Sequence, residues 1–230
     1  ATLFLLFNLG SISASQAKTI SVTSPDDDGY GTFRYAINKA SESKKPVTIK
    51  VKTKKTIIVG DSLDYKGLQP LTIIGSGQVV RGKNVDILKV SNGADLSVSD
   101  LSFVGIGSYN IKRKGTGYGM NNIDAKAGKG IFVDVRDDQT GTVNVNLKNV
   151  RVEGVANHGI HISDCNLADE CGSGGGGAGE GSSASINVVL DNVTVFDVGN
   201  GKFDADGLRV DERGDGDINF TASNSSFLYV

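Results

Sequence analysis

The residues best suited to acid–base chemistry are two histidines and a charged group that follows them near the C-terminal end. His158 and His161 are the only histidines, and Asp206, Arg209 and Asp211 come later in the chain. A carboxylate beside an imidazole raises its pKa toward neutrality, as proton transfer requires. These five residues are candidate catalytic groups if the fold brings them together; the alternative is an ordinary polar surface.

A sequence repeat could bring these residues together. Each copy has a glycine followed by apolar residues at every second position, as in a short strand after a turn. The copies are Gly130-Ile131-Phe132-Val133-Asp134, Gly159-Ile160-His161-Ile162-Ser163 and Gly207-Leu208-Arg209-Val210-Asp211. Stacked as neighbouring strands, they would align Phe132, His161 and Arg209 on the outer face, with Lys129, His158 and Asp206 aligned just before them.

A second strand signal recurs in step with the first and ends in asparagine. Asn149, Asn192 and Asn224 end three copies, and Asp100 ends an earlier one, 49 residues before Asn149. That spacing leaves room for more than one coil. Equivalent positions of stacked coils lie one strand spacing apart, so these side chains should form a hydrogen-bonded ladder at a turn. We expect them to point inward, so that the glycosylation sequons at Asn192 and Asn224 carry no glycan.

Repeats of tens of residues built from strands indicate a solenoid, in which each coil buries its apolar face against its neighbours. The chain has 230 residues with 38% hydrophobic content, enough for one sizeable core. Its 31 glycines against 3 prolines suit many tight turns. We assign residues 47–230 to the coils and treat the glycine-rich stretch 165–183 as a loop inserted into a turn.

The N-terminal residues predict a leader and a cap. Residues 1–17 carry no charge and end in Ser15-Gln16-Ala17 after a short apolar run, which is typical of part of a signal peptide. Residues 18–46 should cap the first coil with a short amphipathic helix that begins after Thr32. The missing initiator Met and the strand-like end at Val230 lead us to expect a fragment with further coils beyond it.

The charge distribution and the two cysteines limit the kinds of partner and the chemistry that we expect. Net charge is only -2, but residues 1–115 are net positive and residues 116–230 net negative, so the two ends should face different partners. Nucleic acid is disfavoured, because the lysines are interleaved along predicted strands with few aromatic residues. Cys165 and Cys171 would form a disulfide in an exported protein, with two free thiols as the alternative.

Three segments carry a family resemblance over residues 19–105: Gly31-Thr32-Phe33-Arg34-Tyr35-Ala36-Ile37, Leu71-Thr72-Ile73-Ile74-Gly75-Ser76-Gly77, and the stretch from Val90 to Phe103. This order resembles the N-terminal part of right-handed parallel β-helix proteins of the pectate-lyase-like superfamily. The resemblance implies an all-β fold, a single right-handed parallel β-helix with a short N-terminal capping helix. It leaves function open, because the superfamily includes polysaccharide lyases, hydrolases and adhesins.

The acidic turn around Asp206 raises the question of calcium. Asp204, Asp206 and Asp211 offer hard oxygen ligands of the kind that Ca²⁺ prefers, although a solvated acidic turn is the alternative. The lyase resemblance implies Asp-bound Ca²⁺ and an arginine in the basic role, for which Asp206, Asp211 and Arg209 are the nearest matches. The chain departs from those lyases in having no Trp.

Two functions follow from these observations. We expect a secreted or cell-surface protein, monomeric and without a transmembrane segment, that binds extracellular glycans or serves as a structural or adhesive surface module. The alternative is a polysaccharide lyase or hydrolase that acts on acidic, uronate-containing polysaccharides.

Overall fold

The computed structural model describes residues 17–82, 85–105, 128–136, 138–164, 181–199 and 205–230. Almost all regular structure in these residues is β-strand, with a single helix α1 (Phe33–Ser41). The strands are β1 (Lys18–Val22), β2 (Val47–Val51), β3 (Ile57–Val59), β4 (Leu63–Tyr65), β5 (Leu71–Gly82), β6 (Leu88–Val90), β7 (Leu96–Gly105), β8 (Ile131–Val135), β9 (Thr142–Glu153), β10 (Ile160–Asp164), β11 (Ser185–Asp191), β12 (Thr194–Phe196), β13 (Leu208–Glu212), β14 (Ile218–Ser223) and β15 (Ser226–Leu228).

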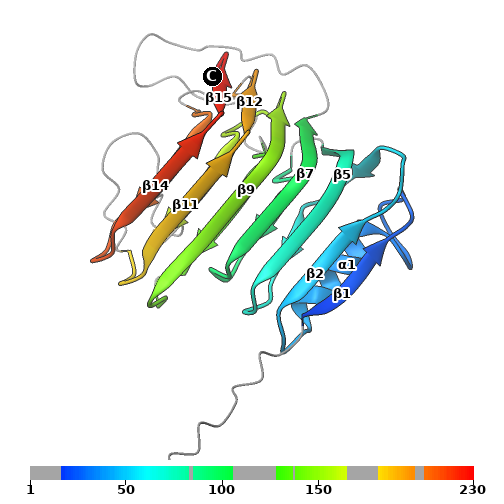
Figure 1. Ribbon diagram of the computed structural model, residues 1–230, viewed down its shortest axis with the longest axis horizontal. Helices are drawn as coiled ribbons and strands as arrows, with labels where there is room; N and C mark the ends of the chain where they lie inside the picture. Colours follow the sequence, from blue (N-terminus) through cyan, green and yellow to red (C-terminus); the bar gives the residue numbers. More distant parts are fainter. Residues whose placement is uncertain (1–16, 83–84, 106–127, 137, 165–180, 200–204) are drawn as a thin grey trace, which may run out of the picture.

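The strands form two parallel sheets. The larger, sheet A, has the order β1-β2-β5-β7-β9-β11-β14, with β3, β12 and β15 paired alongside, and it faces the viewer in Figure 1. The smaller, sheet B, has the order β4-β6-β8-β10-β13. From β4 onward the chain passes repeatedly between the sheets and returns one strand further along each time. The expected all-β fold of parallel strands is confirmed, and it is consistent with a β-solenoid.

The strand register confirms the repeat in sheet A. Val98 of β7 pairs with Leu147 of β9, which pairs with Leu190 of β11. Because β7 and β9 are direct neighbours, Asp100 and Asn149 are one coil apart, and the prediction of room for more than one coil was wrong. The extra length of this coil lies largely in residues 106–127, outside the described part of the chain.

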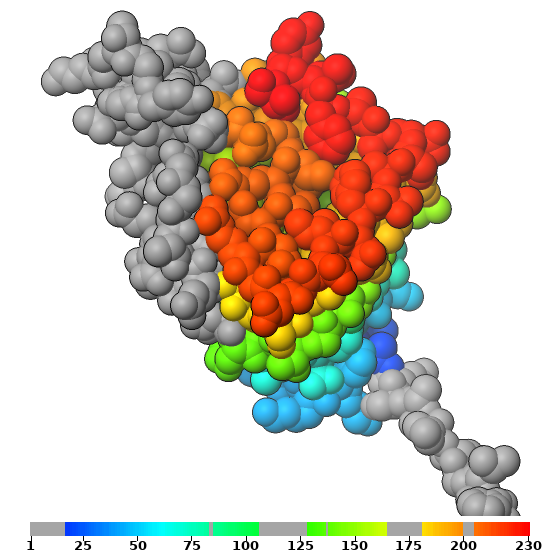
Figure 2. Space-filling model, turned by 90° about the vertical axis from the view of Figure 1, so that its left-hand side faces the viewer, coloured from blue at the N-terminus to red at the C-terminus, as the bar shows by residue number. Residues whose placement is uncertain are grey.

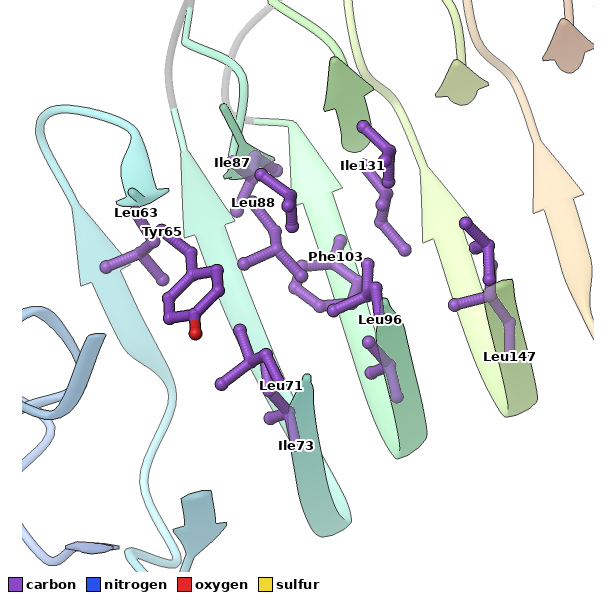
Figure 3. Close-up of a cluster of buried hydrophobic side chains, with 14 of the residues drawn as sticks. Leu63, Tyr65, Leu71, Ile73, Ile87, Leu88, Leu96, Phe103, Ile131 and Leu147 are labelled. Atoms are coloured by element: carbon purple, nitrogen blue, oxygen red, sulfur yellow. The ribbon is translucent and has the colours of Figure 1, made fainter. Parts of the chain in front are cut away.

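The core lies between the sheets, where alternate strand residues point inward. Leu71, Ile73, Leu96, Phe103 and Leu147 from sheet A are almost completely buried there. Figure 3 shows them facing Leu63, Tyr65, Leu88 and Ile131 of sheet B. Each such apolar side chain stabilises the fold by about 1.5–3 kcal/mol through burial.

The predicted asparagine ladder is present, but on the outside of the fold. The Nδ2 of Asn149 donates to Asp100 Oδ1 at 2.8 Å, and that of Asn192 donates to Asn149 Oδ1 at 2.9 Å. Asn149 and Asn192 are exposed, so the prediction that these side chains point inward was wrong. The ladder residues have left-handed backbones, with φ of 58°, 52° and 56°, and the residues that follow the two asparagines, Val150 and Val193, take the inward positions.

A second ladder of side-chain hydrogen bonds links the same coils. Asn144 Nδ2 lies 3.2 Å from Asp95 Oδ1, and Asn187 Nδ2 lies 3.0 Å from Asn144 Oδ1. These residues come five positions before the first ladder on each strand. Two rows of side-chain hydrogen bonds therefore tie β7, β9 and β11 together across the outer face of sheet A.

Helix α1 lies at the N-terminal end of the sheets, as expected. The hydroxyl of Thr32 caps it by accepting from the Tyr35 amide at 3.2 Å. Its buried face consists of Phe33, Ala36, Ile37 and Ala40, and it packs against β4, β1 and β2. Among the described residues, no helix is long and apolar enough to cross a membrane.

The opposite end of the sheets is formed by β13, β14 and β15. Figure 2 looks onto this end, drawn in orange and red. Ile218 and Phe220 of β14 are about half exposed there, at 45% and 48%, whereas the paired positions on β11, Ile186 and Val188, are fully buried.

Candidate functional site

The outer face of sheet B brings the candidate residues together. Ile131 pairs with Ile160 and Ile160 with Leu208, so Phe132, His161 and Arg209 form one row across β8, β10 and β13. The next outward positions, Asp134, Ser163 and Asp211, form a second row. The predicted adjacency of the three copies is therefore confirmed. We call these outward side chains, together with Lys129, His158 and Asp206, the sheet B cluster.

Glycine at the start of each copy allows the coils to stack this closely. A Cβ on Gly130 would lie 2.6 Å from the carbonyl oxygen of Gly159, and one on Gly159 would lie 2.6 Å from that of Gly207. Backbone oxygens cannot move aside as flexible side chains can. These glycines are thus required by the approach of neighbouring coils rather than by an unusual φ.

Asp211 contacts both His161 and Arg209 in the C-terminal part of the sheet B cluster. Its Oδ2 lies 2.8 Å from His161 Nε2, and its Oδ1 and Oδ2 accept from Arg209 Nε at 3.0 and 2.9 Å. Burial alone would raise the pKa of Asp211. The hydrogen bonds from His161 and Arg209 outweigh it and hold that pKa well below its usual range. Asp211 is therefore a carboxylate at any physiological pH.

His161 is a neutral base with one free nitrogen. Burial lowers its pKa, and nearby Lys129 and Arg209 lower it further, against the opposing effect of Asp211. The expected rise toward neutrality was wrong for this residue, because the imidazole is almost fully buried. The neutral ring donates from Nε2 to Asp211. Its Nδ1 lone pair is buried and has no hydrogen-bond partner among the residues that the structure describes.

His158 lies beside His161, with ring centroids 4.8 Å apart in an edge-to-face arrangement. Its Nδ1 accepts the backbone N–H of Asp206 at 2.8 Å, so that nitrogen carries no proton. The 3.4 Å approach of Asp206 Oδ2 to the same atom is consequently not an ion pair. His158 therefore contributes as a buried, neutral ring that fixes the turn before β13.

Two lysines converge on the aromatic ring at the other side of the cluster. Lys129 Nζ lies 4.3 Å and Lys89 Nζ 5.7 Å from the ring centroid of Phe132. Among the described residues, the only carboxylate within 4 Å of Lys129 Nζ is that of Asp86, at a long 3.9 Å. Lys89 forms no ion pair within the described part of the chain. Asp134 and Asp64 also lie in the vicinity of the two lysines, but among the described residues only Asp86 brings a carboxylate within 4 Å of either ammonium group.

Asp134 and Ser163 complete the cluster. Burial raises the pKa of Asp134 to about 6, although Lys89 and Lys129 oppose the rise. Asp134 can therefore exchange a proton near neutral pH. Ser163, in the neighbouring strand β10, is fully buried, and within the described part of the chain its hydroxyl has no hydrogen-bond partner.

Sequence reasoning missed three residues of this face: Asp64 of β4, Asp86 in the turn before β6, and Lys89 of β6. Asp64 pairs with Lys89 in the strand register, in the row that continues to Phe132. The alternation in Leu88-Lys89-Val90 was a usable signal. It was overlooked because Ile87 stands where the later copies have glycine.

The described residues do not complete a calcium site. Asp206 and Asp211 both lie beside the Arg209 guanidinium, at 3.8 and 2.9 Å, and that positive charge disfavours a cation between them. No group of three or more His, Cys, Asp or Glu side chains in the described residues could hold a metal ion. Asp204 lies outside these residues, as do Cys165 and Cys171, and the expectations for them stay predictions.

The two ends of the glycine-rich insert are joined by hydrogen bonds from Ser182 to Asp164. Asp164 at the end of β10 is fully buried and accepts from the Ser182 amide at 2.9 Å and its hydroxyl at 2.8 Å. These two charge-assisted bonds join the chain on either side of residues 165–180. These hydrogen bonds hold the two ends of the insert together at its base.

Comparison with known proteins identifies no relative. A scan against protein-family models, a search of curated proteins and a search of solved structures each found no match to the chain. The function is consequently argued from the chemistry of the sheet B cluster.

Proposed function

We propose that the protein is an exported or cell-surface right-handed parallel β-helix of the pectate-lyase-like superfamily, and that the sheet B cluster binds an acidic extracellular polysaccharide. What supports the fold assignment is the stacking of parallel strands in two sheets, together with the resemblance of residues 19–105. What supports the ligand is the arrangement of charge on the outer face of sheet B.

The convergence of Lys89 and Lys129 on Phe132 carries the proposal. Two ammonium groups within 5.7 Å of one ring repel each other. Asp134, Asp64 and Asp86 offset part of this repulsion, but among the described residues only Asp86 comes within 4 Å of either ammonium group. A ligand carboxylate placed between them would gain from both charges, whereas a neutral sugar would not. A uronate supplies such a carboxylate on each sugar ring.

The unpartnered polar atoms suit the hydroxyl groups of a sugar. His161 Nδ1 can only accept a hydrogen bond, whereas the Ser163 hydroxyl can donate or accept. Both atoms are buried without a partner in the described residues, which is unfavourable by about 1–3 kcal/mol for each group. A ligand hydroxyl that reached either atom would recover part of this energy.

Cleavage is the second candidate function, and the titration of Asp134 favours it. A lyase needs a base that takes the proton beside the uronate carboxylate, and positive charge that stabilises the resulting carbanion. The electron pair then forms a carbon–carbon double bond, and the leaving sugar oxygen departs and is protonated. Asp134, with a pKa of about 6, could act as the base, and Lys129 could supply the charge.

Calorimetry and ultraviolet absorbance together test both functions. We expect polygalacturonate or alginate oligosaccharides to bind, neutral dextran oligosaccharides not to bind, and Lys129→Ala to weaken binding about tenfold, the loss of one close charge interaction. Lys52→Ala, an exposed lysine outside the cluster, is the matched control. Unsaturated product that disappears in Asp134→Asn and persists with EDTA would establish metal-independent cleavage. Equal affinity for acidic and neutral oligosaccharides would overturn the proposal.

A further inference from the structure

A second groove lies at the opposite end of the molecule from β13, beside the first strand of sheet A. It has a volume of about 330 Å³. One wall is strand β1, and the other consists of Tyr30 and two residues of α1, Tyr35 and Lys39. Figure 1 shows β1 at the edge of the sheet with α1 behind it.

The open edge of β1 carries backbone groups that need partners. In a parallel pair, alternate residues direct both their N–H and C=O toward the neighbouring strand. Lys18 donates to Pro46 at 2.9 Å and Val22 accepts from Lys52 at 2.8 Å, so these residues and Ile20 face β2. Thr19 and Ser21 therefore face away from it. Within the described residues, no strand lies on that side.

At its C-terminal end, the open edge of β1 is already hydrogen-bonded to another segment of the chain. Thr23 continues the outward-facing series, and its amide donates to the carbonyl of Gly31 at 2.8 Å. This contact limits the open length of β1 to the segment around Thr19 and Ser21. The edge is consequently short, which suits a peptide segment rather than a large sheet.

The groove walls specify what could bind there. Tyr30 is 86% exposed and packs against Tyr35 with ring centroids 5.1 Å apart. Large exposed aromatic side chains are typical of interaction surfaces. The side chains of Lys18 and Ile20 point toward the inner side of the sheet, where Lys39 lines the same groove. The site thus offers an aromatic pair, a half-buried isoleucine and two ammonium groups, of which that of Lys39 also pairs with Glu42 at 2.8 Å.

We propose that this groove binds an extended acidic peptide segment of a partner protein, which adds to β1 as an additional strand. The backbone of the peptide pairs with Thr19 and Ser21. An apolar side chain lies over Ile20 and Tyr35, and a carboxylate side chain lies between Lys18 and Lys39. Main-chain bonds supply affinity in this mode of recognition, and the alternate side chains supply specificity.

The positive charge beside β1 disfavours self-association through this edge. In an antiparallel pair of two β1 strands, both copies would bring Lys18 and Lys39 to one seam, and like charges at close range disfavour pairing. An acidic segment has the complementary charge. The proposal goes beyond the polysaccharide site, because it involves neither sheet B nor any of its residues.

The test uses fluorescein-labelled peptides in which threonine alternates with glutamate and valine, measured by fluorescence polarisation against the full chain. We expect these peptides to bind at least about tenfold more tightly than copies with lysine in place of glutamate. N-methylation of the residues that pair with β1 should abolish binding, whereas N-methylation of the intervening residues should not. The protein is unchanged in this comparison, so loss of folding cannot explain the result.

Variants of the groove provide the second arm. Ser21→Pro removes an N–H that faces away from β2, a position where proline is tolerated on an edge strand, and it should abolish peptide binding. Lys39→Ala should weaken it, and Lys52→Ala, outside the groove, should not. Equal binding of glutamate and lysine peptides, or insensitivity to both N-methylation patterns, would overturn the proposal. Preferential binding of oligosaccharides through Tyr30 would also overturn it and assign the groove to sugars.

Discussion

The Nε2 of His161 lies 2.8 Å from the Oδ2 of Asp211, a residue 50 positions further along the chain. The contact exists because β10 and β13 are neighbours, with His161 beside Arg209 and Ser163 beside Asp211 in the register. It therefore joins two coils through the same groups that could carry chemistry. Stability and function at this face should respond together when either residue is changed.

Asp211→Ala should lower the free energy of unfolding by about 1–3 kcal/mol, because it leaves the His161 Nε2–H and the Arg209 guanidinium without their carboxylate. Asp138→Ala is a matched control. Asp138 also follows an arginine by two residues and binds it at 2.6 Å, but both side chains are largely exposed. Urea denaturation should show no measurable loss for that control, because solvent screens the exposed pair. Equal losses would contradict the role given to Asp211.

The effect of Asp211 should also depend on pH. Its pKa is lower in the folded protein than in the unfolded chain, so its contribution is present above the unfolded value of about 4 and is lost as pH falls below it. The difference in stability between the wild type and Asp211→Ala should therefore shrink below about pH 4. A difference that persists undiminished under acid conditions would mean that packing, rather than charge, is responsible.

Asp134→Asn should change the free energy of unfolding in the opposite direction from Asp211→Ala. The pKa of Asp134 is raised to about 6 in the folded state, so folding takes up a proton between about pH 4 and 6, and stability falls as pH rises through this range. Replacement by the neutral amide should raise the free energy of unfolding at pH 7.5 by about 1 kcal/mol, allowing for partial solvent screening. It should also reduce the dependence of the free energy of unfolding on pH in this range. Urea titrations across the range measure both effects, and a less stable variant at pH 7.5 would refute the assignment.

Asn149 should be replaceable by glycine more easily than by alanine. Its φ of 52° costs alanine about 1–2 kcal/mol but costs glycine little. Both variants lose the hydrogen bonds to Asp100 and Asn192, worth about 1 kcal/mol each at most for such exposed groups. Asn146→Ala, on the same strand and exposed, is the control. If alanine and glycine at 149 destabilise equally, the left-handed turn contributes nothing to the ladder.

Local patterns in the sequence predicted strand adjacency but not the environment of the side chains. Gly130 and Gly159 each precede an alternating strand, and this regularity was enough to place His161 beside Arg209. The burial of His161 depends on everything packed over the outer face, which no local pattern encodes, and so the direction of its pKa shift was wrong. Asn149 was placed in the right ladder but on the wrong side, because a left-handed residue reverses the alternation of the strand.

Gly159→Ala should damage the fold and the candidate site together. The added Cβ would lie 2.5 Å from Val195 Cγ1 on β12 and 2.6 Å from the carbonyl oxygen of Gly207, the equivalent glycine of the next coil. Overpacking of this kind costs about 1–3 kcal/mol. Because His161 follows two residues later, the displaced strand should also lengthen the contact with Asp211 and weaken binding of acidic oligosaccharides. Gly60→Ala is the control, since its Cβ would meet only a flexible carboxylate oxygen of Asp27 at 3.3 Å. Thermal unfolding and calorimetry should show both losses in Gly159→Ala and neither in the control. Full affinity in a destabilised Gly159→Ala protein would show that ligand binding does not depend on the close stacking of these two coils.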